Sequence, residues 1–393
     1  MKFDQVREEI PALQESLYLN TGTFGPMPRV VVEELTRTYQ FIFSKGPFHP
    51  AVKDELTKGY LKARERVARL IGADPQEVAF TRNISEGINL VAGGFDWKPG
   101  DEVIITDQEH ESGLLPWLHL TRTRGLQVKV LTLTNSYLQI LSKLADLLTS
   151  RTRLLALSHV TCSTGLRLPV EEICRIAHKK GIPVLLDGAQ AVGQFPVNVK
   201  EIGCDFYAAC GHKWLLGPLG VGMLYLHPAY LSQLQISQIG WGSCSTFDWE
   251  TYEYTLKTSA ERYEYGTRAV PLYMAMEKGI EFVSTWDLQE IASWVAHLAS
   301  YTKDRLLQIP GVRLYSPLDP ALSTGLITFS LDTLPSEELL TLLWSQWKIL
   351  SRLVKKPDGV RISIAFFTQE AEIEVFLQGI EKIVAERRKT HGL

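Results

Sequence analysis

The sequence predicts an α/β protein in which a mostly parallel sheet lies between helical layers. Short apolar runs of the kind that form buried parallel strands recur at residues 78–82, 101–106, 126–131, 154–160 and 183–186. Helical patterns separate several of these runs, which is the spacing of strand–helix–strand units. A chain of 393 residues also exceeds a usual single core, so we expect two domains.

The composition is that of an ordinary globular protein and excludes several function classes. The net charge is −3 with acids and bases interspersed, which argues against nucleic acid as a partner. The first residues, MKFDQVREEIPAL, contain no apolar signal core, and no run is long enough to span a bilayer. We therefore expect a cytoplasmic protein without a membrane partner. Five cysteines without a paired CxxC spacing suggest neither a disulfide framework nor a structural metal site.

The chain before the first predicted sheet strand has two features. Residues 17–20 are strand-like and lead into a breaker-rich loop at 21–26. Residues 51–72 carry an apolar stripe at three- and four-residue steps, which predicts an amphipathic helix that packs on the core. The members of this stripe are Leu56, Tyr60, Ala63, Val67, Leu70 and Ile71.

Two neighbouring predicted strands end in residues whose side chains can take part in catalysis or ligand binding. The run 183–186 ends at Asp187, and the run 205–209 ends in Cys210-Gly211-His212-Lys213. Ligands of open α/β sheets bind at the carboxyl ends of the strands. Two adjacent strand ends thus offer an acid and an amine, although each residue alone also fits a helix cap or a solvated turn.

An acid and a lysine together suit pyridoxal phosphate (PLP). This cofactor needs a lysine for its Schiff base and an anion beside its pyridine nitrogen. The string DGAQ, followed at this distance by GHKWLLGP, resembles the class V aminotransferase family, which includes cysteine desulfurases, selenocysteine lyases and cysteine/cystine C-S lyases. The resemblance implies that PLP is bound by Asp187, Gln190, His212 and Lys213, with Lys213 also catalytic.

The resemblance covers nearly the whole chain and implies fold type I of PLP enzymes. The expected large domain spans residues 18–255 and contains a mostly parallel, seven-stranded sheet between helices. The expected small α+β domain combines residues 1–17 and 256–393, with strands at 312–315 and 325–331 and a final helix from about residue 370.

A phosphate site is expected where the run 78–82 passes into residues 83–90. A serine before an apolar-periodic run marks the beginning of a helix, and the free amides of a helix N-terminus suit phosphate. An ordinary capped helix is the alternative. Family members grip the PLP phosphate with a similar turn, which implies a role here for the amides of Ile84 and Ser85 and for the Ser85 hydroxyl.

The strand-like run 101–106 is followed by His110, which could be a partly exposed loop residue. In the family, the histidine of a similar Glu-His pair stacks on the cofactor ring. The resemblance implies that His110 restrains the ring by face contact, and the near-neutral pKa of imidazole suits it to relay a proton.

Several segments are expected near the substrate. The family places a segment similar to Gly22-Thr23 as one wall of the site, and Trp241 lies in a glycine-flanked loop expected nearby. Alternation in residues 359–364 puts Arg361 on the face opposite its apolar neighbours. A solvated strand arginine is the alternative. The resemblance implies that Arg361 pairs with the substrate α-carboxylate as a two-pronged donor.

Residues 262–268 form either a polar turn before a helix or part of a second active site. In the family a similar Glu-x-Gly-Thr segment reaches into the neighbouring subunit, where its threonine binds phosphate. The resemblance therefore implies that Thr267 binds the cofactor of a partner subunit and that the active unit is a homodimer.

The sequence departs from the desulfurase pattern at two places. Residues 161–162 are Thr-Cys where desulfurases commonly have Ser-Asn, so Cys162 is either a small apolar filler or a residue that alters specificity. The nucleophilic cysteine that desulfurases carry shortly before the carboxylate-binding arginine is missing, because the last cysteine of the chain is Cys244. A β-elimination needs no such thiol.

We therefore expect a PLP-dependent carbon–sulfur lyase that converts L-cystine or L-cysteine to pyruvate, ammonia and cysteine persulfide or sulfide. The resemblance is nearest to the cyanobacterial type of L-cysteine/cystine C-S lyase. One alternative is a desulfurase or selenocysteine lyase that uses Cys210 or Cys244 and yields alanine. Others are an epimerase of the same fold and a non-catalytic PLP-binding protein. Sulfur metabolism, including sulfur supply to iron–sulfur clusters through an acceptor protein, is compatible with the family.

Overall fold

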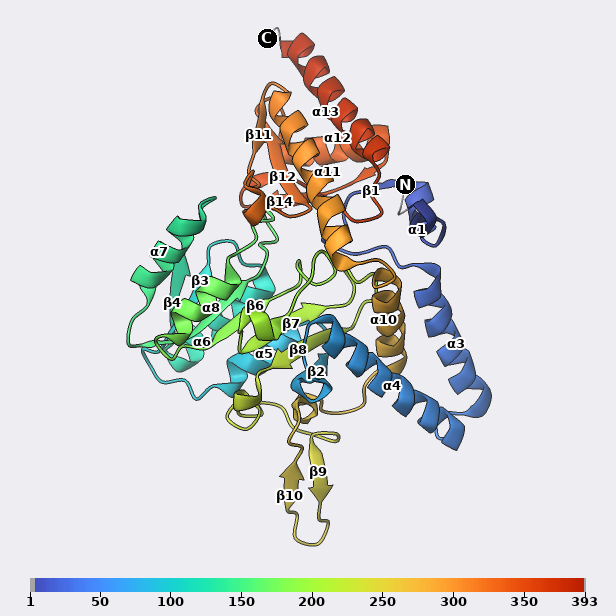
Figure 1. Ribbon diagram of the computed structural model, residues 1–393, viewed down its shortest axis with the longest axis vertical. Helices are drawn as coiled ribbons and strands as arrows, with labels where there is room; N and C mark the ends of the chain where they lie inside the picture. The colour runs from blue at the N-terminus through green and yellow to red at the C-terminus, as the bar shows by residue number, and fades with distance from the viewer. Residues whose placement is uncertain (1–3, 392–393) are drawn as a thin grey trace.

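The computed structural model describes residues 4–391, and a seven-stranded sheet lies at its centre (Figure 1). In spatial order the strands are β2 (Val78–Thr81), β8 (Gly222–Leu226), β7 (Phe206–Cys210), β6 (Val184–Asp187), β5 (Thr152–Ser158), β3 (Glu102–Thr106) and β4 (Gln127–Leu131). Five neighbouring strands, from β7 to β4, are parallel, and β8 is antiparallel to both of its neighbours. The predicted fold class, with a mostly parallel seven-stranded sheet, is confirmed.

The central strands of the sheet are buried on both faces because they are mostly apolar, whereas the edge strand β4 is partly exposed. In β3, Val103 and Ile105 pack into one hydrophobic cluster and Ile104 packs into the other. The same alternation separates Phe206 from Tyr207 in β7. Successive side chains of a strand point to opposite faces, so a continuous apolar run supplies both helical layers.

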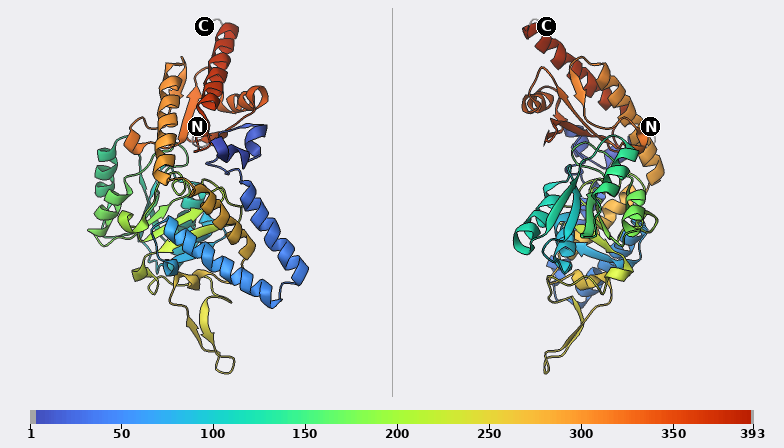
Figure 2. Two further views of the ribbon diagram at one scale, coloured as in Figure 1. Left: turned by 45° about the vertical axis from the view of Figure 1, so that its right-hand side comes forward. Right: turned by 90° about the vertical axis from the view of Figure 1, so that its left-hand side faces the viewer.

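Helices cover both faces of this sheet (Figures 1 and 2). Their bounds are α4 (Pro50–Leu70), α5 (Ile84–Gly94), α6 (Glu111–Arg124), α7 (Tyr137–Leu147), α8 (Val170–His178), α9 (Val199–Ile202) and α10 (Val270–Val283). Helix α3 (Arg29–Lys45) lies outside this layer and packs against α10. The predicted amphipathic helix over 51–72 is present as α4, whose Ala63 and Val67 are fully buried. Across residues 4–391, no helix combines the length and the apolar character needed to cross a membrane.

A smaller antiparallel sheet lies above the large one in Figure 1. Its order is β11 (Val312–Leu314), β12 (Leu326–Leu331), β15 (Asp358–Ser363) and β14 (Arg352–Lys355). The accompanying helices are α11 (Leu288–Gln308), α12 (Ser336–Trp347) and α13 (Glu370–His391). The N-terminal segment, with α1 (Asp4–Glu8) and α2 (Ala12–Glu15), joins this part through β1 (Leu17–Tyr18), which pairs with β13 (Ile349–Leu350).

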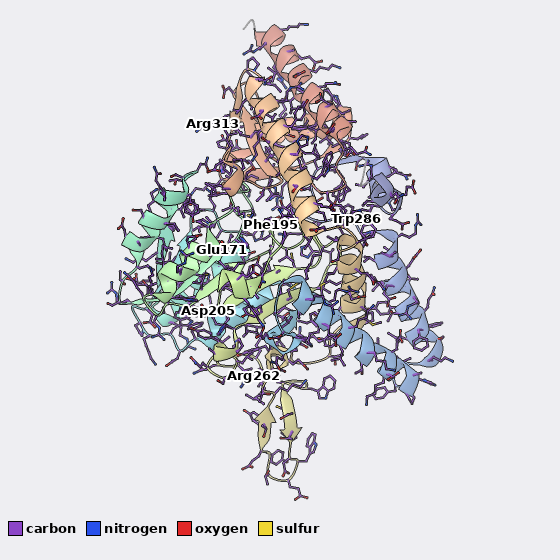
Figure 3. All side chains as sticks on the ribbon, in the orientation of Figure 1. Glu171, Phe195, Asp205, Arg262, Trp286 and Arg313 are labelled. Carbon is purple, nitrogen blue, oxygen red and sulfur yellow. The ribbon has the colours of Figure 1, made fainter. Side chains whose placement is uncertain are left out.

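The connection between the two sheets passes through aromatic contacts. Trp286 lies near the lower end of α11 in Figure 3, and its ring centroid is 5.5 Å from that of Phe282 and 5.6 Å from that of Phe366.

Helix α10 packs closely on α4. A Cβ added to Gly59 of α4 would lie only 2.6 Å from Met274 of α10. The domain boundaries at residues 17/18 and 255/256 remain predictions.

A hairpin of β9 (Cys244–Phe247) and β10 (Tyr254–Leu256) projects away from the rest of the molecule (Figure 1). Exposed aromatic side chains along it include Phe247, Trp249, Tyr252 and Tyr254. After the hairpin, the 3-10 helix η3 (Ala260–Tyr263) returns the chain to the large sheet.

A buried ion pair fixes the segment that follows η3. The Glu264 carboxylate accepts hydrogen bonds from Arg64 Nη1 and Nη2 at 2.7 and 3.0 Å, from the Phe80 amide at 2.6 Å and from the Tyr60 hydroxyl at 2.8 Å. The two charged side chains are only 3% and 7% exposed. The Arg64 guanidinium also lies 4.8 Å from the centroid of the Phe80 ring. All four carboxylate bonds tie residues 260–268 to helix α4 and strand β2.

Removing one partner of this pair should destabilise the protein strongly. Glu264→Ala removes the main partner of the buried Arg64 charge and leaves only the Val78 carbonyl and the more distant Glu261 carboxylate, so we expect the free energy of unfolding to fall by about 3 kcal/mol. The matched control is Asp54→Ala, which breaks the Lys58–Asp54 pair whose side chains are 73% and 61% exposed. That control should cost less than about 1 kcal/mol. Urea unfolding measures both, and equal losses would contradict the account.

Candidate active site

The carboxyl ends of β6 and β7 bring Asp187 and Lys213 to the same edge of the sheet. The two strands are parallel and adjacent, and Asp187 pairs with Ala208 in their register. Lys213 follows the tight turn at Gly211, where a Cβ would lie 2.7 Å from the Met276 sulfur. Burial raises the pKa of Asp187, and the Lys213 charge opposes this rise. The predicted acid and amine therefore lie within electrostatic reach of each other.

Asp187 has one oxygen held by the protein. Its Oδ1 accepts a hydrogen bond from the Ala189 amide at 2.9 Å. The turn that supplies this amide depends on Gly188, because a Cβ there would lie 2.1 Å from the Tyr207 ring. The carboxylate is thus oriented by its own turn, and its Oδ2 is left for a partner.

His110 lies beside these two residues and begins helix α6. Its Nδ1 accepts a hydrogen bond from the Ser112 amide at 3.1 Å, so the proton of the neutral ring belongs on Nε2. Burial and then the Lys213 charge lower the pKa of His110, and the Asp187 charge opposes them. The lowered pKa favours the neutral form of the ring at neutral pH.

The N-terminus of α5 forms an anion cradle. Its cap is Asn83, whose side-chain oxygen accepts from the Glu86 amide at 2.9 Å, so the expectation that a serine begins this helix was wrong by two residues. Ile84 and Ser85 precede the first intrahelical bond, and their amides point out of the helix. The Ser85 hydroxyl donates to Ser112 Oγ at 2.8 Å, which links the cradle to His110.

Several further nitrogen atoms near the site are buried and lack a hydrogen-bond partner among the described residues. Among residues 4–391, Nδ1 of His212 and Nε and Nη2 of Arg268 are buried without a hydrogen-bond partner. Burial lowers the pKa of His212 to about 4, so this ring is neutral. Open amides, unpaired donors, a carboxylate and a lysine match the phosphate, ring nitrogen and aldehyde of PLP. The residues present therefore fit this cofactor.

Gln190 has a clear structural partner in addition to its predicted cofactor role. Its Nε2 donates to the Gly22 carbonyl at 2.8 Å, and its Oε1 accepts from Trp214 Nε1 at 2.9 Å. A Cβ on Gly22 would lie 2.7 Å from the end of the Leu326 side chain, so the loop approaches its neighbours closely here. Gln190 thus fixes the loop that carries Gly22 and Thr23.

Arg361 is buried and faces the same loop. It is 2% exposed, and it donates from Nη1 to the Cys162 carbonyl at 2.5 Å and from Nη2 to Thr23 Oγ1 at 3.0 Å. This burial excludes the alternative of a solvated strand arginine. Burial lowers the pKa of Arg361 to about 10, and the charge of Arg352 adds to the decrease.

A second arginine, which the sequence analysis did not single out, meets Arg361 at Thr23. Arg352 is the antiparallel partner of Arg361 in β14–β15, and its Nη1 donates to Thr23 Oγ1 at 3.3 Å. Its positive charge also lowers the pKa of His110. Two guanidinium groups therefore converge beside the predicted substrate wall. Arg352 could have been identified from the alternation of side chains in residues 352–363, which form two strands joined by a tight turn.

Thr267 and Trp241 occupy a different region from this arginine pair. Both are exposed, Trp241 by 81%, and the Gly266 amide donates to the Trp241 carbonyl at 2.7 Å. Among residues 4–391, neither shows a hydrogen bond to Asp187, Lys213 or Arg361. Trp241 therefore groups with the Thr267 segment, and its contact with substrate remains a prediction.

The cysteines are all free, and most are buried. Burial raises the pKa of Cys162, against the charges of Arg361 and Lys213. Burial also raises the pKa of Cys210 to about 11. Cys244, in the projecting hairpin, is partly exposed. Within the described chain, no group of three His, Cys, Asp or Glu side chains could hold a metal ion.

Comparisons with known sequences agree with this geometry. The family model described as Aminotransferase class-V matches residues 17–376. Isopenicillin N epimerase of Streptomyces clavuligerus is 32% identical over 380 residues, which cover 94% of this chain and 95% of that protein. The cysteine desulfurase of Serratia proteamaculans (strain 568) is 31% identical over 404 residues, which cover 97% of this chain and 98% of that one.

Two solved structures of the protein C-DES share the fold. One, a mutant with glycine covalently linked to the PLP cofactor, is 28% identical with a TM-score of 0.89 and covers 95% of this chain and 98% of its own. The other is a complex of this cystine C-S lyase with its reaction product, cysteine persulfide. It is 28% identical with a TM-score of 0.88 and covers 94% of this chain and 98% of its own. These likenesses confirm the expected PLP fold type I.

Proposed function

The chain belongs to the class-V aminotransferase family and binds PLP, and from this premise we propose that it catalyses β-elimination on L-cystine, and on L-cysteine. Cystine and water would give pyruvate, ammonia and cysteine persulfide. One observation carries the choice. The segment 336–361, where desulfurases of this family hold their nucleophile, contains no cysteine and instead presents Arg352 beside Arg361.

Each residue at the sheet edge has a role in this proposal. PLP supplies the electron sink that stabilises charge at Cα of the substrate. The Lys213 amine removes the Cα proton, and Asp187 keeps the ring nitrogen protonated. Arg361 binds the α-carboxylate, which orients the Cα–H bond toward Lys213. Neutral His110 covers the cofactor ring.

The thiols of the chain support elimination over sulfur capture. A cysteine attacks sulfur as its thiolate, and the raised pKa values of Cys162 and Cys210 leave little thiolate at neutral pH. In an elimination the sulfur departs with its electron pair, and a persulfide is a less basic leaving group than sulfide. Cystine is therefore the favoured substrate.

The arginine pair supports the same substrate. Cystine carries two carboxylates, one on each half, whereas cysteine carries one. With Arg361 on the α-carboxylate of the reacting half, Arg352 is placed to bind the carboxylate of the departing half. The likeness to C-DES, described as a cystine C-S lyase, agrees with this assignment.

Two other candidate functions have specific support. Likeness to cysteine desulfurases favours a reaction that yields alanine, with Cys244 as the most accessible thiol. Likeness to isopenicillin N epimerase favours a proton transfer at Cα that leaves the carbon–sulfur bond intact. A PLP-binding protein without turnover is a third alternative. The products distinguish all of these.

We also propose that the enzyme is a cytoplasmic homodimer. Five free thiols suit a reducing compartment. The exposure of Thr267, on the segment that Glu264 fixes, and of Trp241, whose carbonyl accepts a hydrogen bond from the Gly266 amide, supports a role in a partner's site. Mixing Lys213→Ala chains with Thr267→Ala chains should restore activity, because one site of the hybrid is intact. A monomeric active enzyme in analytical ultracentrifugation would contradict this. A protein that accepts the released sulfur is a further proposed partner.

The product assay tests the proposed reaction. The wild-type enzyme should form pyruvate from cystine, and more slowly from cysteine, because sulfide is the poorer leaving group. A variant with Cys162, Cys174, Cys204, Cys210 and Cys244 replaced should keep most of this activity, provided that its circular dichroism and cofactor absorbance show a folded, PLP-loaded protein. Alanine from the wild type, lost in the thiol-free variant, would identify a desulfurase instead.

The arginine pair predicts selectivity between the two substrates. Arg352→Gln removes one charge-assisted hydrogen bond to the second carboxylate, so KM for cystine should rise by about 10- to 100-fold. KM for cysteine should change by less than about threefold, because cysteine has no second carboxylate. Lys355→Gln, on the same strand and exposed, is the matched control. Equal changes for both substrates would contradict the role of Arg352.

A further inference from the structure

A second carboxyl group, that of the partly buried Glu109, lies close to Asp187. Its Oε1 accepts from Thr106 Oγ1 at 2.7 Å and from the Ser158 amide at 3.0 Å, and its Oε2 accepts from Ser158 Oγ at 2.5 Å. Ser158 is also the strand partner of Asp187 in the β5–β6 register. One serine therefore connects the two acids, and the proposed reaction uses only Asp187.

The two carboxyl groups also line the same small cavity. Its volume is about 10 Å³, and its other walls include Ile88, Trp117 and Leu185. This is close to the lower limit for a single water molecule. Because the surroundings are apolar, the charges of Glu109 and Asp187 are poorly screened from each other.

This placement affects the pKa of Glu109. Burial raises the pKa of Glu109 to about 7, the Asp187 charge adds to the rise, and the hydrogen bonds from Ser158 and Thr106 oppose it. The other titratable groups at this edge include Cys162, which senses the Glu109 charge, and His110, which adjoins Glu109 in the chain. Burial and the Asp187 charge also raise the pKa values of Cys210 and Tyr207. Lys213 faces Asp187. The nearby parts of β3, α5 and α6 contribute Thr106, Ile88, Gly113 and Trp117, which carry no charge.

We propose that Glu109 is a positioning residue for the cofactor-binding Asp187 and that it releases a proton to solvent when the cofactor ring binds. The protonated ring nitrogen neutralises the Asp187 charge, which is the charge that opposes ionisation of Glu109. Once ionised, Glu109 in turn stabilises the cation at Asp187. This inference depends on the PLP cofactor and not on which sulfur reaction the enzyme catalyses.

The sign of the pH dependence follows from proton counting. Glu109 has a higher pKa without the cofactor than with it, so the complex binds fewer protons. The affinity for the cofactor then rises with pH through the range in which Glu109 titrates. Well below that range, ionisation of Glu109 contributes nothing to the affinity. Glutamine cannot titrate, so Glu109→Gln should remove this contribution, and it also replaces the Oε2 atom that accepts from Ser158 Oγ with an amide nitrogen. Its amide oxygen can still accept from Thr106 and from the Ser158 amide.

The test uses the full chain stripped of cofactor and pyridoxine 5′-phosphate, which has the ring nitrogen and the phosphate but cannot form a bond to Lys213. At about pH 6 the wild type and Glu109→Gln should have dissociation constants within about twofold of each other. At about pH 8 the wild type should bind pyridoxine 5′-phosphate about three- to tenfold more tightly than Glu109→Gln does. The upper limit is the factor of about ten that corresponds to a pKa difference of one unit. The matched control is Glu111→Gln, an exposed acid two residues later, which should behave as wild type at both values.

Two results would overturn the proposal. A ratio of dissociation constants that does not change with pH would show that Glu109 is not coupled to the ring, and weaker binding of the variant at both values would indicate a purely structural role. If Glu109→Gln does not fold, Ser158→Ala gives a second test. It removes one hydrogen bond to ionised Glu109, so the pH at which affinity rises should move upward. An unmoved pH profile in Ser158→Ala would also contradict the coupling.

Discussion

The proposed active site depends on the pairing of an acid and an amine at the ends of two adjacent parallel strands. Parallel strands bring their carboxyl ends to one edge, so β6 and β7 deliver Asp187 and Lys213 side by side. Asp187 is only 8% exposed, which makes its charge sensitive to its neighbours. The helix N-terminus of α5, the ring of His110 and the arginines of the small sheet all converge on this edge.

Much of this arrangement could be predicted from local sequence. Buried apolar runs located the strands, and a polar residue at the end of each run located Asp187 and Lys213. The alternation of apolar residues around Arg361 correctly predicted that its side chain lies on the strand face opposite its apolar neighbours. Only the fold shows that this face meets the Gly22–Thr23 loop. The cap of α5 was misplaced because Asn83 and Ser85 are both favoured cap residues and lie two positions apart.

The residues that the sequence analysis missed depend on pairing between distant segments. Glu109 matters because β5 lies beside β3 and brings Ser158, 49 residues away, against its carboxylate. Arg352 matters because the register of β14 and β15 places it opposite Arg361. Strand registers of this kind are set by packing on the whole sheet and are not written in any one segment.

The central claim is that Lys213 holds the cofactor. Its most direct test is reduction of the PLP-loaded enzyme with borohydride, which makes the lysine–cofactor bond permanent, followed by proteolysis and mass spectrometry of the peptides. The account predicts a pyridoxyl phosphate group on the peptide that contains Lys213, and on no other lysine. A label on a different lysine, or an unchanged label in Lys213→Ala, would contradict it.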